Sequence, residues 1–272
     1  MKLLLTSILS FLYLLTIAQQ RNYVDLKDIF DNHEGCFVLY DVKNDRYIYY
    51  NDSICKIRYS PCSTFKIPNS LIALESGVAN DENYMIEYDS IKIPSEPWML
   101  ESEPFKYWLQ DHSLKTAFKN SVVWYYQELA ARIGAERMNK YINLINYGNK
   151  DISSGVDEFW LCGSMQISAN EQVEFLKKLY SKQLIGFSER SQQIVKGIML
   201  YESTDNYKLY GKTGGGDCWE NKVIGWYVGF LEANDNTYIF AMNIKANNFS
   251  YFANNKRITL TKEMFKILDI IH

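Results

Sequence analysis

Strand-like segments lie at both ends of the chain, and a long stretch with helical spacing separates them. The segments are runs of β-branched and aromatic residues, which favour the half-buried surface of a sheet. They cover residues 35–42 and 46–50 near the start, and 207–213, 223–231 and 238–244 near the end. Because each strand needs a hydrogen-bonded partner, the sequence predicts one sheet assembled from both termini.

Between and after these strands, the apolar residues recur with the helical period. Ser168 is expected to cap its helix together with Glu171, and Gly134 to divide the helical region of residues 113–145. The polar, proline-containing stretch 81–103 is expected to be a surface loop. Helices are predicted over residues 63–77, in pieces over 113–145, after Ser168, near 188–200 and over 257–271.

The predicted fold class is therefore α/β (α+β). It is a mixed, largely antiparallel sheet built from N- and C-terminal strands with flanking helices, plus an inserted all-helical lobe. Residues 19–272 are expected to form a single domain, with a sheet lobe of about 19–60 and 190–272 and a helical lobe of about 61–189. Such an arrangement places a cleft where the two lobes meet.

The first 18 residues have the pattern of a secretory signal peptide. Lys2 precedes an apolar run of roughly 15 residues, and Thr16 and Ala18 are small residues ahead of an expected cleavage site. A spanning helix needs about 20 apolar residues, which makes an uncleaved anchor the less favoured alternative. We therefore expect an exported protein that has no membrane contact once the signal is removed.

Charge and cysteine usage exclude several classes of function. The formal net charge is −3 and the basic residues are scattered, so no nucleic-acid partner is predicted. The five cysteines show no C-x-x-C motif or Cys/His cluster with metal-ligand spacing, so no metal site is predicted. Because the chain can build a large core, we expect buried free thiols and no bridge essential for folding. The cysteines are Cys36, Cys55, Cys62, Cys162 and Cys218.

The segment around Ser63 and Lys66 places a hydroxyl and an amine on one face at the start of a helix. Residues three apart on a helix are neighbours, so Lys66 can lie beside the Ser63 hydroxyl and, if neutral, accept its proton. Apolar neighbours such as Phe65 and Ile67 favour the neutral amine by desolvation. By itself this S-x-x-K spacing also fits an ordinary amphipathic helix.

Two further motifs add polar groups. Ser121-Val122-Val123 offers a second hydroxyl that can relay a proton, although Ser121 also fits a simple helix N-cap. Lys212-Thr213-Gly214 ends a strand, where an ammonium and a hydroxyl can hold a carboxylate and the glycine permits close approach to the backbone.

Other catalytic classes lack their motifs. The Gly211-Lys212-Thr213 segment is not a P-loop, because Asn206 stands where the first glycine belongs and the segment follows a strand. The chain has three histidines and neither G-x-S-x-G nor H-E-x-x-H, so neither a Ser-His-Asp hydrolase nor a zinc peptidase is predicted.

Taken together, the order S-x-x-K, S-x-V, K-T-G, with spacings of roughly sixty and ninety residues, resembles the serine β-lactamase and penicillin-binding protein superfamily. Within it, the chain resembles the class D (oxacillinase-type) β-lactamases, because Ser121-Val122-Val123 replaces the S-D-N triplet of class A. The resemblance covers the mature chain and includes residues 60–70, 120–125, 147–149, 159–161, 212–214 and 224–229.

The resemblance implies β-lactam hydrolysis through an acyl-enzyme on Ser63, in a bacterial periplasmic or secreted protein that confers resistance. It implies no cofactor apart from carbon dioxide, which N-carboxylates Lys66 so that it acts as the general base. The loop of residues 146–163 has one glutamate, Glu158, and lacks the glutamate-plus-asparagine pattern with which class A enzymes activate water. The implied carbamate pocket is formed by Phe65, Val123, Trp160 and Leu161.

The remaining roles also follow from the resemblance. Ser121 would pass the proton to the lactam nitrogen, and the backbone N–H groups of Ser63 and Gly215 would form the oxyanion hole. The substrate's carboxylate would be bound by Lys212, Thr213, Gly214 and Arg257. For Arg257 an equal alternative is a surface charge at the start of the last helix. Cys62 stands where alanine is usual, and neither it nor Cys218 has an assigned role.

Two alternatives remain open from the sequence. One is a penicillin-binding transpeptidase or carboxypeptidase, which acylates without rapid turnover and which Val123 disfavours. The other is a covalent β-lactam sensor domain, which requires membrane helices and a protease partner. The sequence leaves open the substrate spectrum and whether the protein is a monomer or a homodimer.

Overall fold

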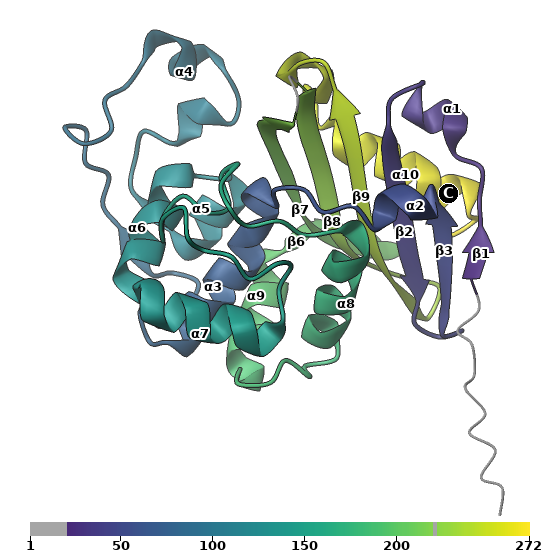
Figure 1. Ribbon diagram of the computed structural model, residues 1–272, viewed down its shortest axis with the longest axis horizontal. Helices are drawn as coiled ribbons and strands as arrows, with labels where there is room; N and C mark the ends of the chain where they lie inside the picture. Colours follow the sequence, from purple (N-terminus) through teal and green to yellow (C-terminus); the bar gives the residue numbers. More distant parts are fainter. Residues whose placement is uncertain (1–20, 220–221) are drawn as a thin grey trace, which may run out of the picture.

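A seven-stranded sheet joins the two ends of the chain (Figure 1). The computed structural model describes residues 21–219 and 222–272, and the predicted signal peptide lies outside them. The strand order is β1-β3-β2-β9-β8-β7-β6, in which β1 is parallel to β3 and the other neighbours are antiparallel. The predicted fold class is therefore confirmed. The strands are β1 Arg21–Tyr23, β2 Gly35–Asp41, β3 Arg46–Tyr50, β6 Leu200–Ser203, β7 Tyr207–Trp219, β8 Lys222–Ala233 and β9 Asn236–Ala246.

Both faces of the sheet are covered, which explains the nearly continuous apolar sequence of its central strands. Along β2, Cys36 and Val38 face one core, whereas Phe37 and Leu39 face the other. Successive side chains of a strand alternate in this way. Helices α1 and α10 lie on the second face, while α8 packs against β2 and β9 on the first (Figure 1).

The helical region lies beside one edge of the sheet (Figure 1). It contains the turn of residues 62–65, which carries Ser63. Two short strands, β4 Met85–Ile86 and β5 His112–Ser113, form a separate ladder there. The helices are α1 Lys27–Phe30, α2 Asp52–Cys55, η1 Cys62–Phe65, α3 Lys66–Glu75, α4 Pro97–Glu101, η2 Phe105–Tyr107, α5 Leu114–Lys119, α6 Val123–Ile133, α7 Ala135–Ile145, α8 Ala169–Tyr180, α9 Glu189–Ile198, η3 Phe249–Phe252 and α10 Lys256–Ile267.

Local signals predicted several helix boundaries correctly. Ser168 caps α8, its side chain accepting from the Glu171 backbone N–H while Glu171 reaches back to the Ser168 N–H. Gly134, with a φ of 79°, separates α6 from α7. Because glycine adopts this conformation at little cost, it ends one helix and allows the next to start in a new direction.

Other elements differ from the sequence prediction. Strand β7 runs to Trp219, whereas the prediction ended it at residue 213, because three consecutive glycines favour a break by propensity. The short elements β1, α1, α2 and β6 were not predicted, and residues 81–103 contain β4 and α4 within the expected loop. Among the described residues, no helix combines the length and the apolar character that a membrane span requires.

Candidate active site

Ser63 and Lys66 lie side by side, as their spacing predicts. Ser63 is in η1 and Lys66 begins α3, and 2.9 Å separates Lys66 Nζ from Ser63 Oγ. Ser63 is half-buried, whereas Cys62, Thr64 and Phe65 of the same turn are buried, so Ser63 is the residue of this turn that solvent reaches. Cys62, just before it, has a φ of 47°, a costly conformation of the kind that functional sites often retain.

Lys66 is fully buried, with 0% of its surface exposed. Burial lowers the pKa of Lys66 from 10.5 to about 7, and the nearby Cys62 only partly opposes this effect. The amine lies 5.2 Å from the centre of the Tyr126 ring. A neutral amine next to the Ser63 hydroxyl can act as a base near neutral pH.

Aromatic side chains surround this turn. The rings of Phe65 and Trp160 stack with centroids 5.3 Å apart, and Phe159 meets both rings edge-on. The indole Nε1 of Trp160 is buried without a hydrogen-bond partner among the described residues. A buried donor of this kind is costly, which makes it a candidate for binding an acceptor that joins the pocket.

The structure brings Ser121 to Lys212, although 91 residues separate them. Lys212 Nζ lies 2.7 Å from Ser121 Oγ and 3.1 Å from the Thr213 carbonyl oxygen. Burial, followed by the charges of Lys66 and Arg257, holds the pKa of Lys212 well below its usual value. Ser121 is not the N-cap of α6: Val122 has that position, and Ser121 adopts a φ of 58° in the turn before it.

The glycines of β7 allow this strand to approach the nucleophile turn, which is η1 with Ser63. A Cβ on Gly214 would lie 2.9 Å from the Pro61 carbonyl oxygen and 3.0 Å from Thr64 Cγ2, so a side chain would displace the strand. On the opposite face, Arg257 Nη1 donates to the Gly214 carbonyl oxygen at 2.7 Å. Arg257 is therefore drawn to the K-T-G strand, and it does not have the purely surface position that was the alternative.

The chain's relatives settle its family. The profile of the penicillin binding protein transpeptidase domain matches residues 30–266. β-Lactamase OXA-48 of Klebsiella pneumoniae is 42% identical over 88% of this chain and 84% of its own length. The class D β-lactamase YbXI from Nostoc, a solved structure, is 39% identical with a TM-score of 0.83, and the match covers 91% of this chain and all of that one. The chain belongs to the class D β-lactamase family.

One relative of this class D β-lactamase is a much longer protein. The methicillin resistance mecR1 protein of Staphylococcus aureus is 37% identical over 81% of this chain, but the match covers only 36% of mecR1.

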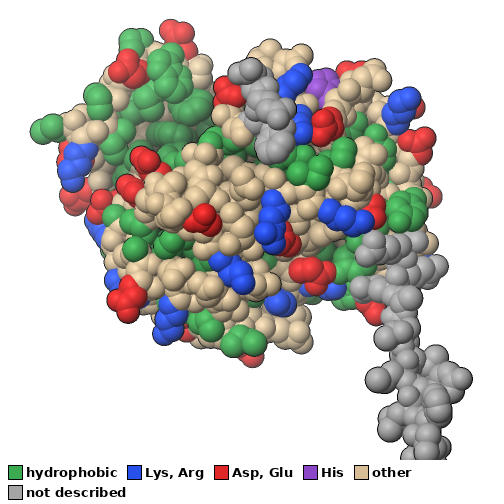
Figure 2. Space-filling model, in the orientation of Figure 1, with side chains coloured by type: hydrophobic (Ala, Val, Ile, Leu, Met, Phe, Trp, Pro, Cys, Tyr) green, Lys and Arg blue, Asp and Glu red, His purple; other side chains and the backbone are tan. Residues whose placement is uncertain are grey.

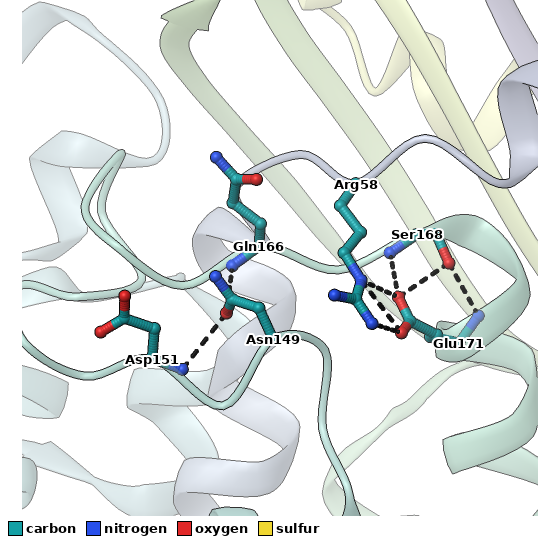
Figure 3. Close-up of polar contacts among 6 residues, drawn as sticks. All are labelled: Arg58, Asn149, Asp151, Gln166, Ser168 and Glu171. Atoms are coloured by element: carbon teal, nitrogen blue, oxygen red, sulfur yellow. Dashed lines mark hydrogen bonds and ion pairs between the residues drawn. The ribbon is translucent and has the colours of Figure 1, made fainter.

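In this class D β-lactamase, the loop that carries Trp160 is braced by Asn149 (Figure 3). The Asn149 amide donates to the Ser164 carbonyl oxygen at 2.8 Å, and its oxygen accepts from the Gln166 and Asp151 backbone N–H groups at 3.0 and 3.2 Å. These bonds join the two ends of the loop. These contacts give Asn149 a structural role in the loop.

A second polar group fixes the segment that leads into the nucleophile turn (Figure 3). The Glu171 carboxylate accepts from Arg58 and from the Ser168 backbone N–H, the latter at 2.9 Å. Glu171, the second residue of the α8 capping box, therefore also holds Arg58, two positions before Ser60.

Two positioning residues were missed by sequence reasoning. Ser60 Oγ donates to the Trp160 carbonyl oxygen at 2.9 Å and accepts from the Cys162 N–H at 3.1 Å. Buried Gln172 donates to Thr64 Oγ1 at 2.9 Å. No local pattern marks either residue, because each acts on a segment about 100 residues away. Trp226 is buried and also donates to the Ser60 carbonyl oxygen.

The expectation of five free thiols is wrong for one pair. Cys162 and Cys218 form a disulfide, whereas Cys36, Cys55 and Cys62 are free and buried. The physical reason is the length of β7, which carries Cys218 past the glycines to the loop that bears Cys162. Whether folding needs this bridge stays a prediction.

The surface next to the site is strongly apolar. Figure 2 shows hydrophobic side chains gathered over the protruding segment around α4 and a hollow beside it. Trp98 and Leu100 of α4 are exposed, as is Tyr107.

The predicted pocket residues Val123 and Leu161 are half-buried, and their contacts with Lys66 stay predictions.

Proposed function

We propose that this chain hydrolyses the amide bond of β-lactams through an ester formed on Ser63. The observation that carries the proposal is the buried Lys66 amine, 2.9 Å from Ser63 Oγ and with a pKa lowered to about 7. Near neutral pH this pair provides a nucleophile and a base in contact.

The reaction divides between the two serine–lysine pairs. Lys66 accepts the Ser63 proton as Oγ attacks the lactam carbonyl carbon. The lactam C–N bond then breaks and Ser121 delivers a proton to the nitrogen. Lys212, whose Nζ is 2.7 Å from Ser121 Oγ, can then give Ser121 a new proton. Water then attacks the ester carbonyl carbon and supplies the hydroxyl of the product acid. Its remaining proton and the proton held by Lys66 return to Ser63 Oγ and Lys212, which regenerates both serine–lysine pairs.

Carbon dioxide, added to Lys66, fits this pocket. The amine is buried, and its lowered pKa means that the neutral form is populated near neutral pH. The neutral amine is the form that reacts with carbon dioxide. The partnerless Trp160 Nε1 is a buried donor able to bind the added group, and Phe65, Val123 and Leu161 would exclude water. Once added, carbon dioxide supplies an oxygen base in place of the amine.

Strand β7 and the start of α10 would bind the substrate. Lys212, Thr213, Gly214 and Arg257 are assigned to the substrate carboxylate, and the Ser63 and Gly215 N–H groups to the carbonyl oxygen. Arg257 carries charge near this strand, although burial lowers its pKa to about 10. A carboxylate ligand would favour the charged forms of both Lys212 and Arg257.

We propose export for the same chain, with residues 1–18 removed as a signal peptide. The support is the sequence pattern, because these residues lie outside those that the structure describes.

A covalent β-lactam sensor is the second candidate, and the 37% identity with mecR1 favours it. A sensor would acylate at Ser63 and hold the ester, whereas a hydrolase releases it. The two candidates share every contact above and differ in the rate of deacylation.

The deciding experiment mixes the purified chain with an excess of a chromogenic cephalosporin and follows both colour and intact mass. Continuous turnover with only transient acyl mass supports the hydrolase. A single stoichiometric burst, with a stable adduct on Ser63, would instead exclude the hydrolase and support a protein that binds β-lactams covalently, such as the sensor.

A further inference from the structure

Three cysteine sulfurs meet beside the nucleophile turn. Cys62, in η1, is free, and its Sγ lies 3.7 Å from Cys218 Sγ, whose partner in the disulfide is Cys162. All three Sγ atoms lie within 4.8 Å of one another. The residues come from η1, from the loop after Trp160 and from the end of β7, so no spacing in the sequence reveals the cluster.

The sulfurs converge on one point above a glycine. A Cβ on Gly216 would lie 2.5 Å from Cys218 Sγ and 2.8 Å from both Cys162 Sγ and Cys62 Sγ. Because Gly216 has no side chain, all three sulfurs face the same small space. Three thiolates around one point are the first three ligands of a tetrahedral site for a soft cation.

We propose that, once the Cys162–Cys218 disulfide is reduced, Cys62, Cys162 and Cys218 bind one thiophilic divalent cation, such as Zn²⁺ or Cd²⁺. A Zn–S bond of about 2.3 Å places two sulfurs of a tetrahedron roughly 3.8 Å apart. Cys62 and Cys218 already have this separation, at 3.7 Å. Reduction allows Cys162 and Cys218 to move apart to the same spacing, and water completes the fourth position.

The chemistry balances with an external reductant. A trialkylphosphine takes oxygen from water to become its oxide, and the disulfide gains two electrons and two protons to become two thiols. The exposed position of Cys162 gives the reductant access. Burial raises the pKa of the Cys62 thiol to about 11, so the cation has to displace the thiol protons to the buffer as it binds.

Occupancy has a consequence for the neighbouring site. The cation would join Cys62, adjacent to Ser63, to Cys218, which lies three residues after Gly215 on β7. Since this fixes both assigned oxyanion donors in one arrangement, we expect slower β-lactam turnover. This consequence rests on the proposed function, whereas cation binding itself does not.

The test uses the full chain, reduced with a phosphine, freed of reagent without air and titrated with Cd²⁺. We expect one Cd²⁺ per chain and ultraviolet thiolate-to-metal charge-transfer absorption, with loss of most turnover that a chelator restores. Cys62→Ala should lose the bound Cd²⁺ and this absorption while keeping its basal turnover. The unreduced chain should bind none at this cluster.

Cys55→Ala is the matched control, because Cys55 is also buried and free but lies outside the cluster. It should bind Cd²⁺ as the wild type does. The proposal is overturned if reduced wild type binds no Cd²⁺, if Cys62→Ala keeps the absorption, or if the reduced chain unfolds and so loses the cluster. Bound Cd²⁺ with undiminished turnover would keep the site and refute only the inhibition.

Discussion

Two serine–lysine pairs form the candidate site, and their geometries are alike although their surroundings differ. Lys66 lies 2.9 Å from Ser63, and Lys212 lies 2.7 Å from Ser121. Both lysines are buried, and burial is the main cause that lowers each pKa. By geometry alone, either pair could provide a nucleophile and its base.

The surroundings separate the two roles. Lys66 lies over the Tyr126 ring, next to the stacked Phe65 and Trp160, so its environment favours a neutral amine. Lys212 also donates to the Thr213 carbonyl oxygen and is close enough to Arg257 for their charges to interact. An anionic ligand would relieve that repulsion. Under the proposed function, the same burial would prepare Lys66 to act as a base or to react with carbon dioxide, and would prepare Lys212 to bind the substrate's carboxylate.

The largest expected effect is at the nucleophiles. Ser63→Ala should abolish covalent labelling by penicillin and leave the fold intact, because a hydroxyl at a half-buried position contributes little packing. Ser121→Ala is the matched change in the other pair, and it should still form the ester, more slowly. Intact mass after exposure to penicillin checks both. An adduct on the Ser63→Ala protein would reverse the assignment of the two pairs.

Loss of the base is expected to come next. Lys66→Ala should reduce turnover by about 10²- to 10⁴-fold, as removal of a general base does. Any ester that forms should persist, because water also lacks its base. Steady-state kinetics measures the loss of turnover, and intact mass measures how long the ester persists.

Trp160→Phe sharpens this prediction, because it keeps an aromatic ring and removes the partnerless Nε1 donor together with part of the indole. It should lower turnover and raise the bicarbonate concentration needed for full activity. An unchanged bicarbonate dependence would show that Nε1 does not contact the added group.

Substitutions at Lys212 of the second pair and at the neighbouring Arg257 should reduce activity less. Lys212→Ala and Arg257→Ala each remove a hydrogen bond to a charged group, about 1.5–3 kcal/mol, or roughly 10- to 100-fold in kcat/KM. The loss should be greatest for substrates that carry the carboxylate. Steady-state kinetics with a substrate and its carboxylate ester measure it. An equal loss for both would remove carboxylate binding from the role of this pair.

The smallest effect on chemistry is expected at the loop brace. Asn149→Ala leaves three backbone groups without partners and should destabilise the protein by about 1–3 kcal/mol, with a modest loss of turnover. Asn143→Ala, on an exposed helix face, should stay within about 0.5 kcal/mol. Thermal unfolding compares them. Equal stability of the two variants would contradict the bracing role.

Sequence reasoning succeeded where the signal is local. The contact of Ser63 with Lys66 follows from three residues of helical spacing, and the capping box of α8 follows from Ser168 and Glu171 alone. The sequence does not predict contacts between distant segments. For example, nothing near Ser121 indicates that its partner is Lys212.

The glycines of β7 show why the remainder was out of reach. By propensity Gly214 and Gly216 end a strand, but in the fold they let it approach Pro61 and the three sulfurs. The same extension of β7 produced the Cys162–Cys218 bridge that the sequence did not predict. Close approach is a property of two surfaces, so one segment's sequence does not encode it.

The central claim is that Lys66 is a neutral amine that carbon dioxide converts into the base, and one titration tests it directly. The pKa of Lys66 is lowered, so the amine is neutral above about 7 and becomes protonated as the pH falls through that value. Activity of degassed enzyme should therefore fall on acidification, and added bicarbonate should restore it. Isotopically labelled bicarbonate should give one carbamate signal by NMR that Lys66→Ala lacks. Equal rates with and without bicarbonate below about pH 7, together with no carbamate signal, would contradict the account.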